Sequence, residues 1–242
     1  MPRFFDDSFS PENPVLTDAN ARHIGLSLRM KPQEALTVNS CGTDYHCVIS
    51  AISPDTITLE ILEAVPCSNE PGCRVILFQA LPKADKLEQI IQKSVELGVT
   101  EIVPVLTRRC IARPSAGDFQ KKLPRLQKIA QAAAQQSGRG IIPAVAPLHT
   151  LAQAAARLSD AEVAAVLYEN ETAGSVSFSA LPADAKSYAL FIGSEGGFDP
   201  EEVGLLCEKG CVPVWLGSRI LRCETAPLAA LSVLMFRTGN LG

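Results

Sequence analysis

The sequence predicts an α/β protein in which a small β domain precedes a larger domain with a mainly parallel sheet. Residues 1–70 contain short runs of alternating or β-branched side chains separated by turn residues, which is typical of β structure. From Cys73 onward, strand-like runs alternate with helical periodicity, as in a parallel sheet covered by helices. Near the C-terminus, two blocks each consist of a strand, a glycine-containing loop and a helix, an arrangement in which α/β proteins bind ligands.

The first domain is expected to contain a short helix and several strands. We expect the helix to be capped near Thr17, because threonine is a favoured residue at a helix N-cap. Turn residues bound the runs that we expect to form strands, which are 35–40, 45–53 and 56–65. The stretch 66–72 contains prolines and a glycine and predicts a linker, so the domains are expected to span residues 1–70 and 73–242.

The second domain is expected to alternate strands with helices. Short apolar runs predict strands at 74–81, 102–106, 162–168, 188–192 and 212–216. The helix after the first of these strands should end at Gly98 and bury one face, formed by Leu87, Ile90, Ile91, Ser94 and Val95. A second helix, from about Phe119 to Ser137, should turn its small and apolar residues inward, namely Leu126, Ile129, Ala130, Ala133 and Ala134.

The loop 193–198 belongs to the first C-terminal block. Asp199 is suited to cap the helix that follows, Pro200 fits its first turn, and Glu202 completes a capping box. The loop has no lysine and contains Glu195, which would repel a phosphate, and its glycine spacing differs from that of a dinucleotide fingerprint. Glycines with one carboxylate suit a ligand that carries hydroxyl groups and positive charge. The alternative is a tight turn in which Glu195 is solvated.

The loop 217–223 belongs to the second block and follows a buried strand. Thr225 is the expected cap of the next helix, which is apolar on all sides and must be buried in the core or against a second subunit. The charged residues Arg219, Arg222 and Glu224 therefore lie between two buried elements. Unpaired charges are costly there, so these residues must pair with one another, with a ligand or with another chain.

Both blocks resemble the closing motifs of the SPOUT methyltransferases. Within that superfamily, the chain is similar to the bacterial ribosomal RNA small subunit methyltransferase E family, which methylates N3 of a uridine in 16S ribosomal RNA. The similarity extends along the whole chain, with motifs in the same order: Pro2-Arg3-Phe4-Phe5, His23-Ile24, Leu28-Arg29, the run 86–98, and the run 135–139 followed by Pro143.

The resemblance implies a fold, a cofactor and partners. Residues 1–70 would form a PUA-like β-barrel that binds RNA, and residues 73–242 a SPOUT domain with a Rossmann-like, mainly parallel sheet and a C-terminal trefoil knot. The implied cofactor is S-adenosylmethionine, and the implied partners are 16S ribosomal RNA in the assembled small subunit and a second copy of the chain in a homodimer. The implied cofactor-binding residues are Leu167, Glu169, Gly193, Glu195, Gly196, Gly197, Leu216, Gly217, Ile220, Leu221, Arg222, Thr225 and Ala226.

The chemistry of uridine methylation suggests two catalytic residues. Uridine N3 is protonated at neutral pH and must lose its proton before it attacks a methyl group. We expect Arg222 to stabilise the negative charge that develops on the base, and Glu224, or a backbone or solvent group that it positions, to take the proton. The alternative is that Arg222 and Glu224 form a structural ion pair that holds the loop.

Basic residues are concentrated in the middle of the chain, although the formal net charge is −4. Residues 73–149 carry 12 basic and 5 acidic side chains, whereas both flanking segments are acidic. A local basic surface is sufficient for phosphate contacts, because counterion release depends on the residues that touch the RNA backbone. The RNA-binding candidates are Arg108, Arg109, Arg113 and Arg139, with Arg3 as a further candidate from the first domain.

Bulk properties restrict the remaining possibilities. No apolar stretch reaches the ~20 residues of a membrane span, and a signal-peptide pattern is missing, so we expect a cytoplasmic protein without a membrane partner. The eight cysteines show no Cys-x-x-Cys spacing and there are three histidines, so we expect reduced thiols and no metal site. The alternative functions are a SPOUT methyltransferase for another ribosomal or transfer RNA position, a non-catalytic RNA-binding assembly factor, and a Rossmann-type nucleotide-binding enzyme.

Overall fold

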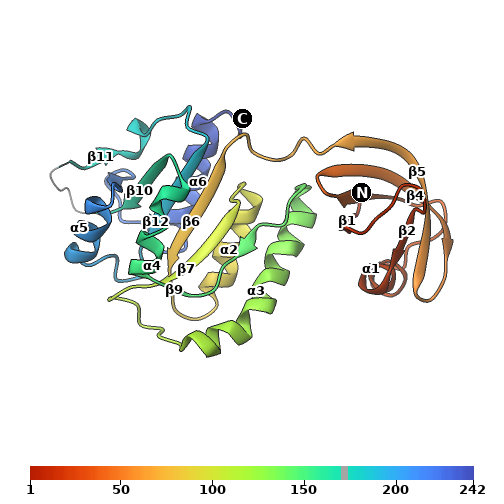
Figure 1. Ribbon diagram of the computed structural model, residues 1–242, viewed down its shortest axis with the longest axis horizontal. Helices are drawn as coiled ribbons and strands as arrows, with labels where there is room; N and C mark the ends of the chain where they lie inside the picture. The colour runs from red at the N-terminus through yellow and green to blue at the C-terminus, as the bar shows by residue number, and fades with distance from the viewer. Residues whose placement is uncertain (170–173) are drawn as a thin grey trace. The chain divides into compact units, whose positions relative to one another are not determined.

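The computed structural model describes residues 1–169 and 174–242 and divides into two compact units (Figure 1). The first unit contains residues 1–70 together with 134–142, and the second contains residues 71–133 and 143–242. The segment 134–142 therefore belongs to the first unit, although it lies between two stretches of the second unit in the sequence. The two units are described in turn.

A five-stranded sheet with the order β1-β3-β4-β5-β2 forms the first unit. β3 (Ala35–Ser40), β4 (Thr43–Ile52) and β5 (Thr56–Pro66) are antiparallel neighbours and confirm the three expected strands. Sequence reasoning missed β1 (Arg3–Phe5), which is parallel to β3, and β2 (Val15–Thr17), which is antiparallel to β5. Both have three residues, which is too short for an alternating pattern to be recognised.

A short helical segment follows β2. α1 (Asp18–Arg22) continues into a π-helical turn, η1 (His23–Ser27). Thr17 occupies the N-cap position, as expected, but its side chain makes no capping hydrogen bond. Its hydroxyl instead donates to the Asp18 carboxylate at 3.1 Å. The segment packs on a core that includes Leu16, Ala21, Ile24, Leu36, Val38 and Ile49.

An eight-stranded sheet organises the second unit, with the order β11-β13-β10-β12-β6-β7-β8 and with β9 beside β7. Every strand pairing in it is parallel over the described residues, which confirms the predicted α/β class. The five expected strands are β6 (Arg74–Ala80), β7 (Glu101–Leu106), β10 (Val163–Leu167), β12 (Ser187–Ile192) and β13 (Val212–Trp215). The strands that were not expected have two residues each: β8 (Ala144–Val145), β9 (His149–Thr150) and β11 (Val176–Ser177).

Helices cover both faces of this sheet. α4 (Leu151–Ala155) and α5 (Pro200–Glu208) share a core with side chains of β6 and β7, among them Ile76, Phe78, Val103 and Val105. α2 (Lys86–Glu96) and α6 (Ala226–Arg237) pack against each other on the opposite side (Figure 1). The remaining elements are the long α3 (Ala116–Ser137) and two 3₁₀ turns, η2 (Leu158–Asp160) and η3 (Phe178–Ala180).

The expected helix faces are largely confirmed. The residues that α2 buries are those of its predicted apolar face, and Gly98 follows the helix with a φ of +93°. In α3, the predicted inner residues Leu126, Ala130, Ala133 and Ala134 are buried, whereas Ile129 is half-buried. α6 buries part of its apolar surface but leaves Phe236 68% exposed. None of the helices in the described chain combines the length and apolar character needed to cross a bilayer.

The two C-terminal helices begin in different ways. At α5 the predicted capping box is present: the Asp199 carboxylate accepts a hydrogen bond from the Glu201 amide at 3.1 Å, and the Glu202 carboxylate accepts one from the Asp199 amide at 3.0 Å. At α6 the expected cap is wrong, because Thr225 has helical backbone angles and its side chain makes no capping hydrogen bond. The α6 start is held instead by the Arg222 carbonyl, which accepts from the Thr225 and Ala226 amides at 2.8 and 2.9 Å.

Candidate functional site

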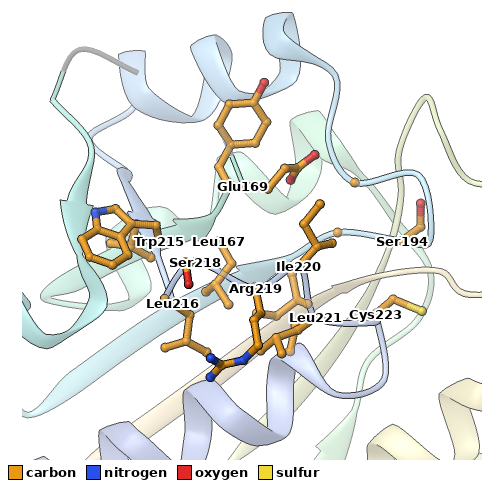
Figure 2. Close-up of a pocket in the computed structure, with 17 residues that line it drawn as sticks. Leu167, Glu169, Ser194, Trp215, Leu216, Ser218, Arg219, Ile220, Leu221 and Cys223 are labelled. Carbon is orange, nitrogen blue, oxygen red and sulfur yellow. The ribbon is translucent and has the colours of Figure 1, made fainter. Parts of the chain in front are cut away.

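The carboxyl ends of three neighbouring strands open into one cavity of about 400 Å³ (Figure 2). β10 lies between β12 and β13 in the sheet, so the chain segments that leave these strands meet at one edge. The loop 193–198 after β12 and the loop 216–221 after β13 supply two walls, and residues 167–169 at the end of β10 supply the third. The structure therefore brings together the two glycine loops that the sequence singled out.

The loop after β12 depends on glycine for its own closure. A Cβ atom at Gly193 would lie 2.9 Å from the Gly197 Cα, so no larger residue fits there without a backbone shift. The Gly197 amide donates to the Ser194 carbonyl at 2.9 Å, and Gly197 has a φ of +66°, which favours glycine. Gly196 does not line the cavity; a Cβ there would lie 2.9 Å from the Arg109 Cβ. These glycines thus shape the loop as well as exposing its main chain.

Apolar side chains and main chain dominate the wall after β13. Gly217 turns the chain with a φ of +86°, and Ile220 is 85% exposed beside the cavity. Arg219 also lines the cavity, and no residue in the described part of the chain makes a hydrogen bond or ion pair with its side chain. The lining residues of this wall are Val214, Trp215, Leu216, Gly217, Ser218, Arg219, Ile220, Leu221, Cys223 and Ala226. Such a surface suits a flat, largely apolar ring.

Glu169 is the acidic residue that lines this cavity within the described part of the chain (Figure 2). It follows β10 and lies close to the glycine loop, because a Cβ on Gly197 would be 3.0 Å from its Oε1. Among residues 1–169 and 174–242, nothing donates a hydrogen bond to this carboxylate or forms an ion pair with it. Glu169 is exposed at the cavity, so its carboxylate is accessible to a ligand that carries hydroxyl groups or positive charge.

Glu195, the acid of the first loop, lies outside the cavity lining. Its Oε1 accepts a hydrogen bond from the Lys83 amide at 3.1 Å and lies 3.2 Å from the Lys86 ammonium. Partial burial raises the pKa of Glu195, but the surrounding backbone amides and Lys86 outweigh this effect, so the pKa lies below its ordinary value. Glu195 is therefore ionised at neutral pH and partnered by protein.

Arg222 and Glu224, the two expected catalytic residues, flank the cavity-lining Cys223 without lining the cavity themselves. Arg222 is exposed, and its guanidinium has no hydrogen-bond or ionic partner within the described residues. Glu224 pairs with Lys86 at 3.0 Å, so the alternative of an Arg222–Glu224 ion pair is wrong. Hydrogen bonds from the Cys223 thiol and Lys86 lower the pKa of Glu224 to about 2.

The structure thus divides the expected cofactor-binding residues into two groups. Those that line the cavity are Leu167, Glu169, Gly193, Gly197, Leu216, Gly217, Ile220, Leu221 and Ala226. Those that do not line it are Glu195, Gly196, Arg222 and Thr225. The expected wall from Leu167 to Glu169 also includes Tyr168, which lines the cavity. Sequence reasoning did not assign seven lining residues to the cofactor site: Ile192, Ser194, Val214, Trp215, Ser218, Arg219 and Cys223. All seven are close in the sequence to assigned residues, and this closeness was the signal that could have identified them.

Three expected RNA-binding arginines lie on the loop after β7, and all are exposed. Arg108 forms ion pairs with Asp199 and Glu201 at the start of α5, and the Arg109 guanidinium donates to the Gly196 carbonyl at 3.0 Å. Arg113 donates to the carbonyls of Thr107 and Arg108 at 2.8 and 2.7 Å. The side chains of Arg108 and Arg109 are 60% and 42% exposed, so their guanidinium groups remain accessible to a phosphate.

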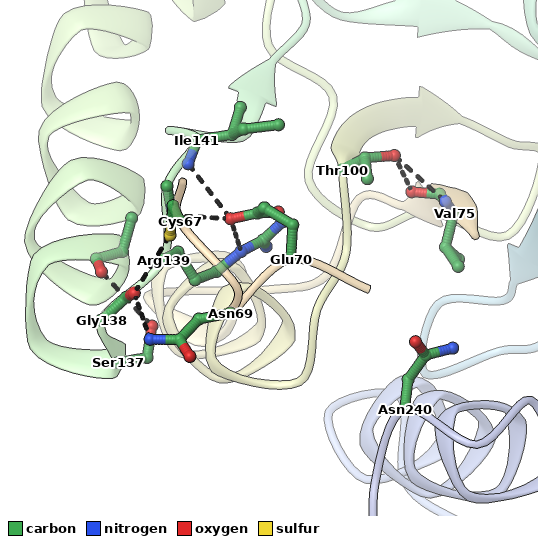
Figure 3. A network of polar contacts seen from close by, with 12 residues as sticks. Cys67, Asn69, Glu70, Val75, Thr100, Ser137, Gly138, Arg139, Ile141 and Asn240 are labelled. Carbon is green, nitrogen blue, oxygen red and sulfur yellow. Dashed lines mark hydrogen bonds and ion pairs between the residues drawn. The ribbon is translucent and has the colours of Figure 1, made fainter. Parts of the chain in front are cut away.

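The other two expected RNA-binding arginines make ion pairs within the first unit, where Arg139 is buried and Arg3 is partly buried. The Arg139 side chain is 3% exposed and pairs with Glu70 at 2.5 Å, and Glu70 also accepts from the Ile141 amide (Figure 3). Arg3 makes two hydrogen bonds to the Asp44 carboxylate, at 2.7 and 2.6 Å, and one to the Arg139 carbonyl at 3.1 Å. Both guanidinium groups thus form ion pairs with carboxylates of the same unit.

Fold and site together define an RNA methyltransferase that carries a PUA domain. A family model described as an RNA methyltransferase domain matches residues 69–235, and one described as an RNA methyltransferase PUA domain matches residues 16–62. More narrowly, the chain belongs to the ribosomal RNA small subunit methyltransferase E family. The Bacillus subtilis member is 34% identical over 229 residues, which cover 92% of this chain and 90% of that protein. The Synechocystis member is 39% identical over 224 residues, or 90% of this chain and 71% of that protein.

Two solved structures with the same fold were determined with S-adenosylmethionine. One is the ribosomal RNA small subunit methyltransferase E of Neisseria gonorrhoeae, with 30% identity, a TM-score of 0.88 and coverage of 98% of this chain and 97% of that one. The other is a putative methyltransferase of Legionella pneumophila, with 30% identity, a TM-score of 0.86 and coverage of 97% and 96%. The likeness thus extends over essentially the whole chain.

Proposed function

We propose that this protein transfers a methyl group from S-adenosylmethionine to N3 of a uridine in 16S ribosomal RNA. The observation that carries the proposal is the cavity at the ends of β10, β12 and β13, which Glu169 lines without a hydrogen-bond or ionic partner among the described residues. Its volume of about 400 Å³ lies in the range of small-molecule sites. The family membership supports the reaction class, and the names of the relatives support ribosomal RNA of the small subunit as the substrate.

The residues of the cavity fit this cofactor. Leu216, Ile220 and Leu221 offer apolar surface and main chain to an adenine ring, and Glu169 offers an acceptor to ribose hydroxyls or to a positively charged group. Gly193 and Gly197 allow the main chain of the first loop to approach the ligand closely. When bound, S-adenosylmethionine supplies the methyl group, which passes to uridine N3 as the carbon–sulfur bond breaks and its electron pair stays on sulfur.

Arg222 is the proposed catalytic cation. It is exposed beside the cavity wall and unpaired within the described chain, so its charge is available to an oxygen of the uridine anion. Glu224, with a pKa of about 2, is a weak proton acceptor, and we assign the N3 proton to solvent, with Glu224 ordering the loop around it. Arg108, Arg109 and Arg113 are the proposed phosphate contacts, because they are exposed on one loop.

The knot, the dimer, the form of the substrate and the roles of the two domains are also proposals. A trefoil knot around the cofactor loops, a homodimer and an assembled small subunit as the substrate are implied by the resemblance. The exposed apolar side chains of Ile220 and Phe236 support an interface with a second copy. Residues 1–70 are the proposed RNA-binding domain and residues 73–242 the proposed catalytic domain.

Calorimetric titration with S-adenosylmethionine, with NAD and ATP as controls, tests the proposal first. We expect selective binding with a dissociation constant on the order of 1 μM, near −8 kcal/mol. Radiolabelled methyl transfer to small subunits and to free 16S ribosomal RNA, followed by mapping of the modified base, then tests the substrate. Methylation of another RNA position would replace the uridine-N3 assignment, and the absence of both binding and transfer would leave an RNA-binding assembly factor.

A further inference from the structure

Lys86 lies between the two loops that build the cavity. It is the first residue of α2, and its ammonium is 3.2 Å from Glu195 Oε1 and 3.0 Å from Glu224 Oε2. Glu195 belongs to the loop after β12, and Glu224 follows the loop after β13. These loops are separated by a helix and a strand in the sequence. One cation thus joins the two loops that line the cavity.

The cluster reaches the cavity wall through Cys223. The Cys223 thiol donates to Glu224 Oε2 at 3.2 Å and lies 3.9 Å from the Lys86 ammonium, and Cys223 itself lines the cavity. The side chains of Lys86, Glu195 and Glu224 are 30%, 25% and 20% exposed, so solvent screens their attraction only in part. A shift of this cluster therefore moves a residue of the ligand site.

Without Lys86, the negative charges of Glu195 and Glu224 would push the two loops apart. Glu195 and Glu224 share one cation, and its removal would leave two neighbouring carboxylates that repel each other. A lysine at the start of a helix is itself unfavourable, because the helix N-terminus carries partial positive charge. The two carboxylates compensate for that position, so the ion pairs, and not the helix, account for the placement of Lys86.

We propose that Lys86 is a positioning residue that clamps the two cavity loops together and thereby sets the affinity for S-adenosylmethionine. The consequence for the cofactor rests on the proposed function, whereas the clamp itself concerns the protein alone. Lys86 is not part of the cavity lining, so its effect on the ligand passes through Glu195, Glu224 and Cys223. Its loss should weaken cofactor binding and leave methyl transfer at saturating cofactor largely unchanged.

Titration of the full-length protein with S-adenosylmethionine tests the proposal in three variants. Lys86→Met removes the charge while keeping most of the chain length, Lys86→Arg keeps the charge, and Lys93→Met removes a lysine from the same helix that pairs with Glu96 instead. We expect Lys86→Met to raise the dissociation constant on the order of tenfold, since small displacements of a binding group have large effects. Lys86→Arg should restore most of the affinity, and Lys93→Met should match the wild type.

A mutant cycle that treats Glu195 and Glu224 as one site separates the clamp from a general loss of helix stability. In the Lys86→Met background, changing both Glu195 and Glu224 to Gln removes the repulsion between them and should recover part of the affinity. No recovery, or equal binding by wild type and Lys86→Met, would overturn the inference while leaving the proposed function intact. Thermal unfolding of each variant shows whether the fold is retained.

Amide hydrogen exchange without cofactor tests the clamp even if the wild type does not bind S-adenosylmethionine. We expect Lys86→Met to speed exchange in residues 193–198 and 217–224 together, and Lys93→Met to leave both loops unchanged. Unchanged exchange in both loops of Lys86→Met would refute the clamp. Faster exchange without any binding by the wild type would support the clamp and refute the proposed cofactor instead.

Discussion

Arg222 and Glu224 are separated by one residue, yet the structure gives them different surroundings. Arg222 is exposed and unpaired within the described chain, whereas Glu224 is held by Lys86 and the Cys223 thiol. At the residue scale, this difference leaves Arg222 available for the proposed contact with an RNA base, whereas Glu224 stabilises the loops around the cofactor site.

Replacing Arg222 with alanine tests the catalytic assignment. We expect turnover to fall by about 10²–10³, the range found when a group that stabilises developing charge is removed, with cofactor affinity unchanged. Single-turnover methyl transfer and calorimetry measure the two quantities separately. A loss of cofactor affinity with normal turnover at saturation would assign Arg222 to the cofactor loop instead.

Gly193 should tolerate no side chain. In the Gly193→Ala variant, the new Cβ would lie 2.9 Å from the Gly197 Cα, so the loop must shift and cofactor affinity should fall by at least about tenfold. Gly204→Ala in α5 is the matched control, because nothing lies within 4 Å of a Cβ at that position. Calorimetry on both variants gives the comparison, and equal affinities would contradict this account of the loop.

The ionisation of Glu224 should make its contribution to stability depend on pH. Its pKa in the folded protein is about 2 and its ordinary value is 4.5, so the contribution is complete above about pH 4.5 and is lost as the pH falls toward 2. The difference in free energy of unfolding between the wild type and Glu224→Gln should be constant from pH 7 to 5 and shrink below pH 4.5. Urea unfolding across this range measures it, and a difference that grew on acidification would be inconsistent with the Lys86 pair.

At the scale of elements, α5 connects the glycine loop to the basic loop. Its capping residue Asp199 accepts a hydrogen bond from the Glu201 amide and forms ion pairs with Arg108 and Arg109. Glu202 accepts from the amides of both Asp199 and Arg108. The start of one helix therefore fixes the loop after β7, which holds the proposed RNA contacts, beside the loop after β12.

The Asp199→Ala variant should destabilise α5 by about 1 kcal/mol, mainly through the lost cap, since exposed ion pairs add little. Glu208→Ala removes the same charge from the last residue of the same helix and serves as the control. Urea unfolding gives the free energies, and RNA binding at several salt concentrations shows whether the arginines lose their arrangement. Equal stability of the two variants would mean that the capping box contributes nothing measurable.

At the scale of the whole molecule, the chain leaves the second unit at residue 133, supplies residues 134–142 to the first unit and returns. The ion pair of Arg139 with Glu70 holds this segment, and the Arg3 side chain, which pairs with Asp44, donates a hydrogen bond to the Arg139 carbonyl. The first unit is therefore complete only when the segment 134–142, which is more than 60 residues away from residues 1–70 in the sequence, is in place.

Removing Glu70 should destabilise the first unit strongly. The Glu70→Ala variant leaves Arg139, which is 3% exposed, without its carboxylate, and loss of one partner of a buried pair costs about 3–5 kcal/mol. Glu63→Ala, an exposed glutamate of β5, is the control. Denaturant unfolding followed by hydrogen exchange localises the effect, and a cost equal to that of the control would show that the pair is screened by water.

The local features of this protein could be predicted from its sequence. Hydrophobic periodicity identified every strand longer than three residues, and the capping box placed the start of α5 where the structure has it. The same reasoning could not find strands of two or three residues, and it assigned to Thr225 a cap that the Arg222 carbonyl provides. Short strands and caps depend on neighbours that lie far away in the sequence, so no local pattern encodes them.

The sequence by itself determined the α/β class and the two glycine loops, because each follows from a pattern within one segment, and its resemblance to a family indicated nine of the residues that line the cavity. Only the tertiary structure decided which charges pair. In the folded protein, Glu195 and Glu224 form ion pairs with Lys86, and the buried Arg139 forms one with Glu70. Glu169 has no partner in the described chain. Ion pairing depends on distances of a few ångströms between segments that only the folded sheet brings together.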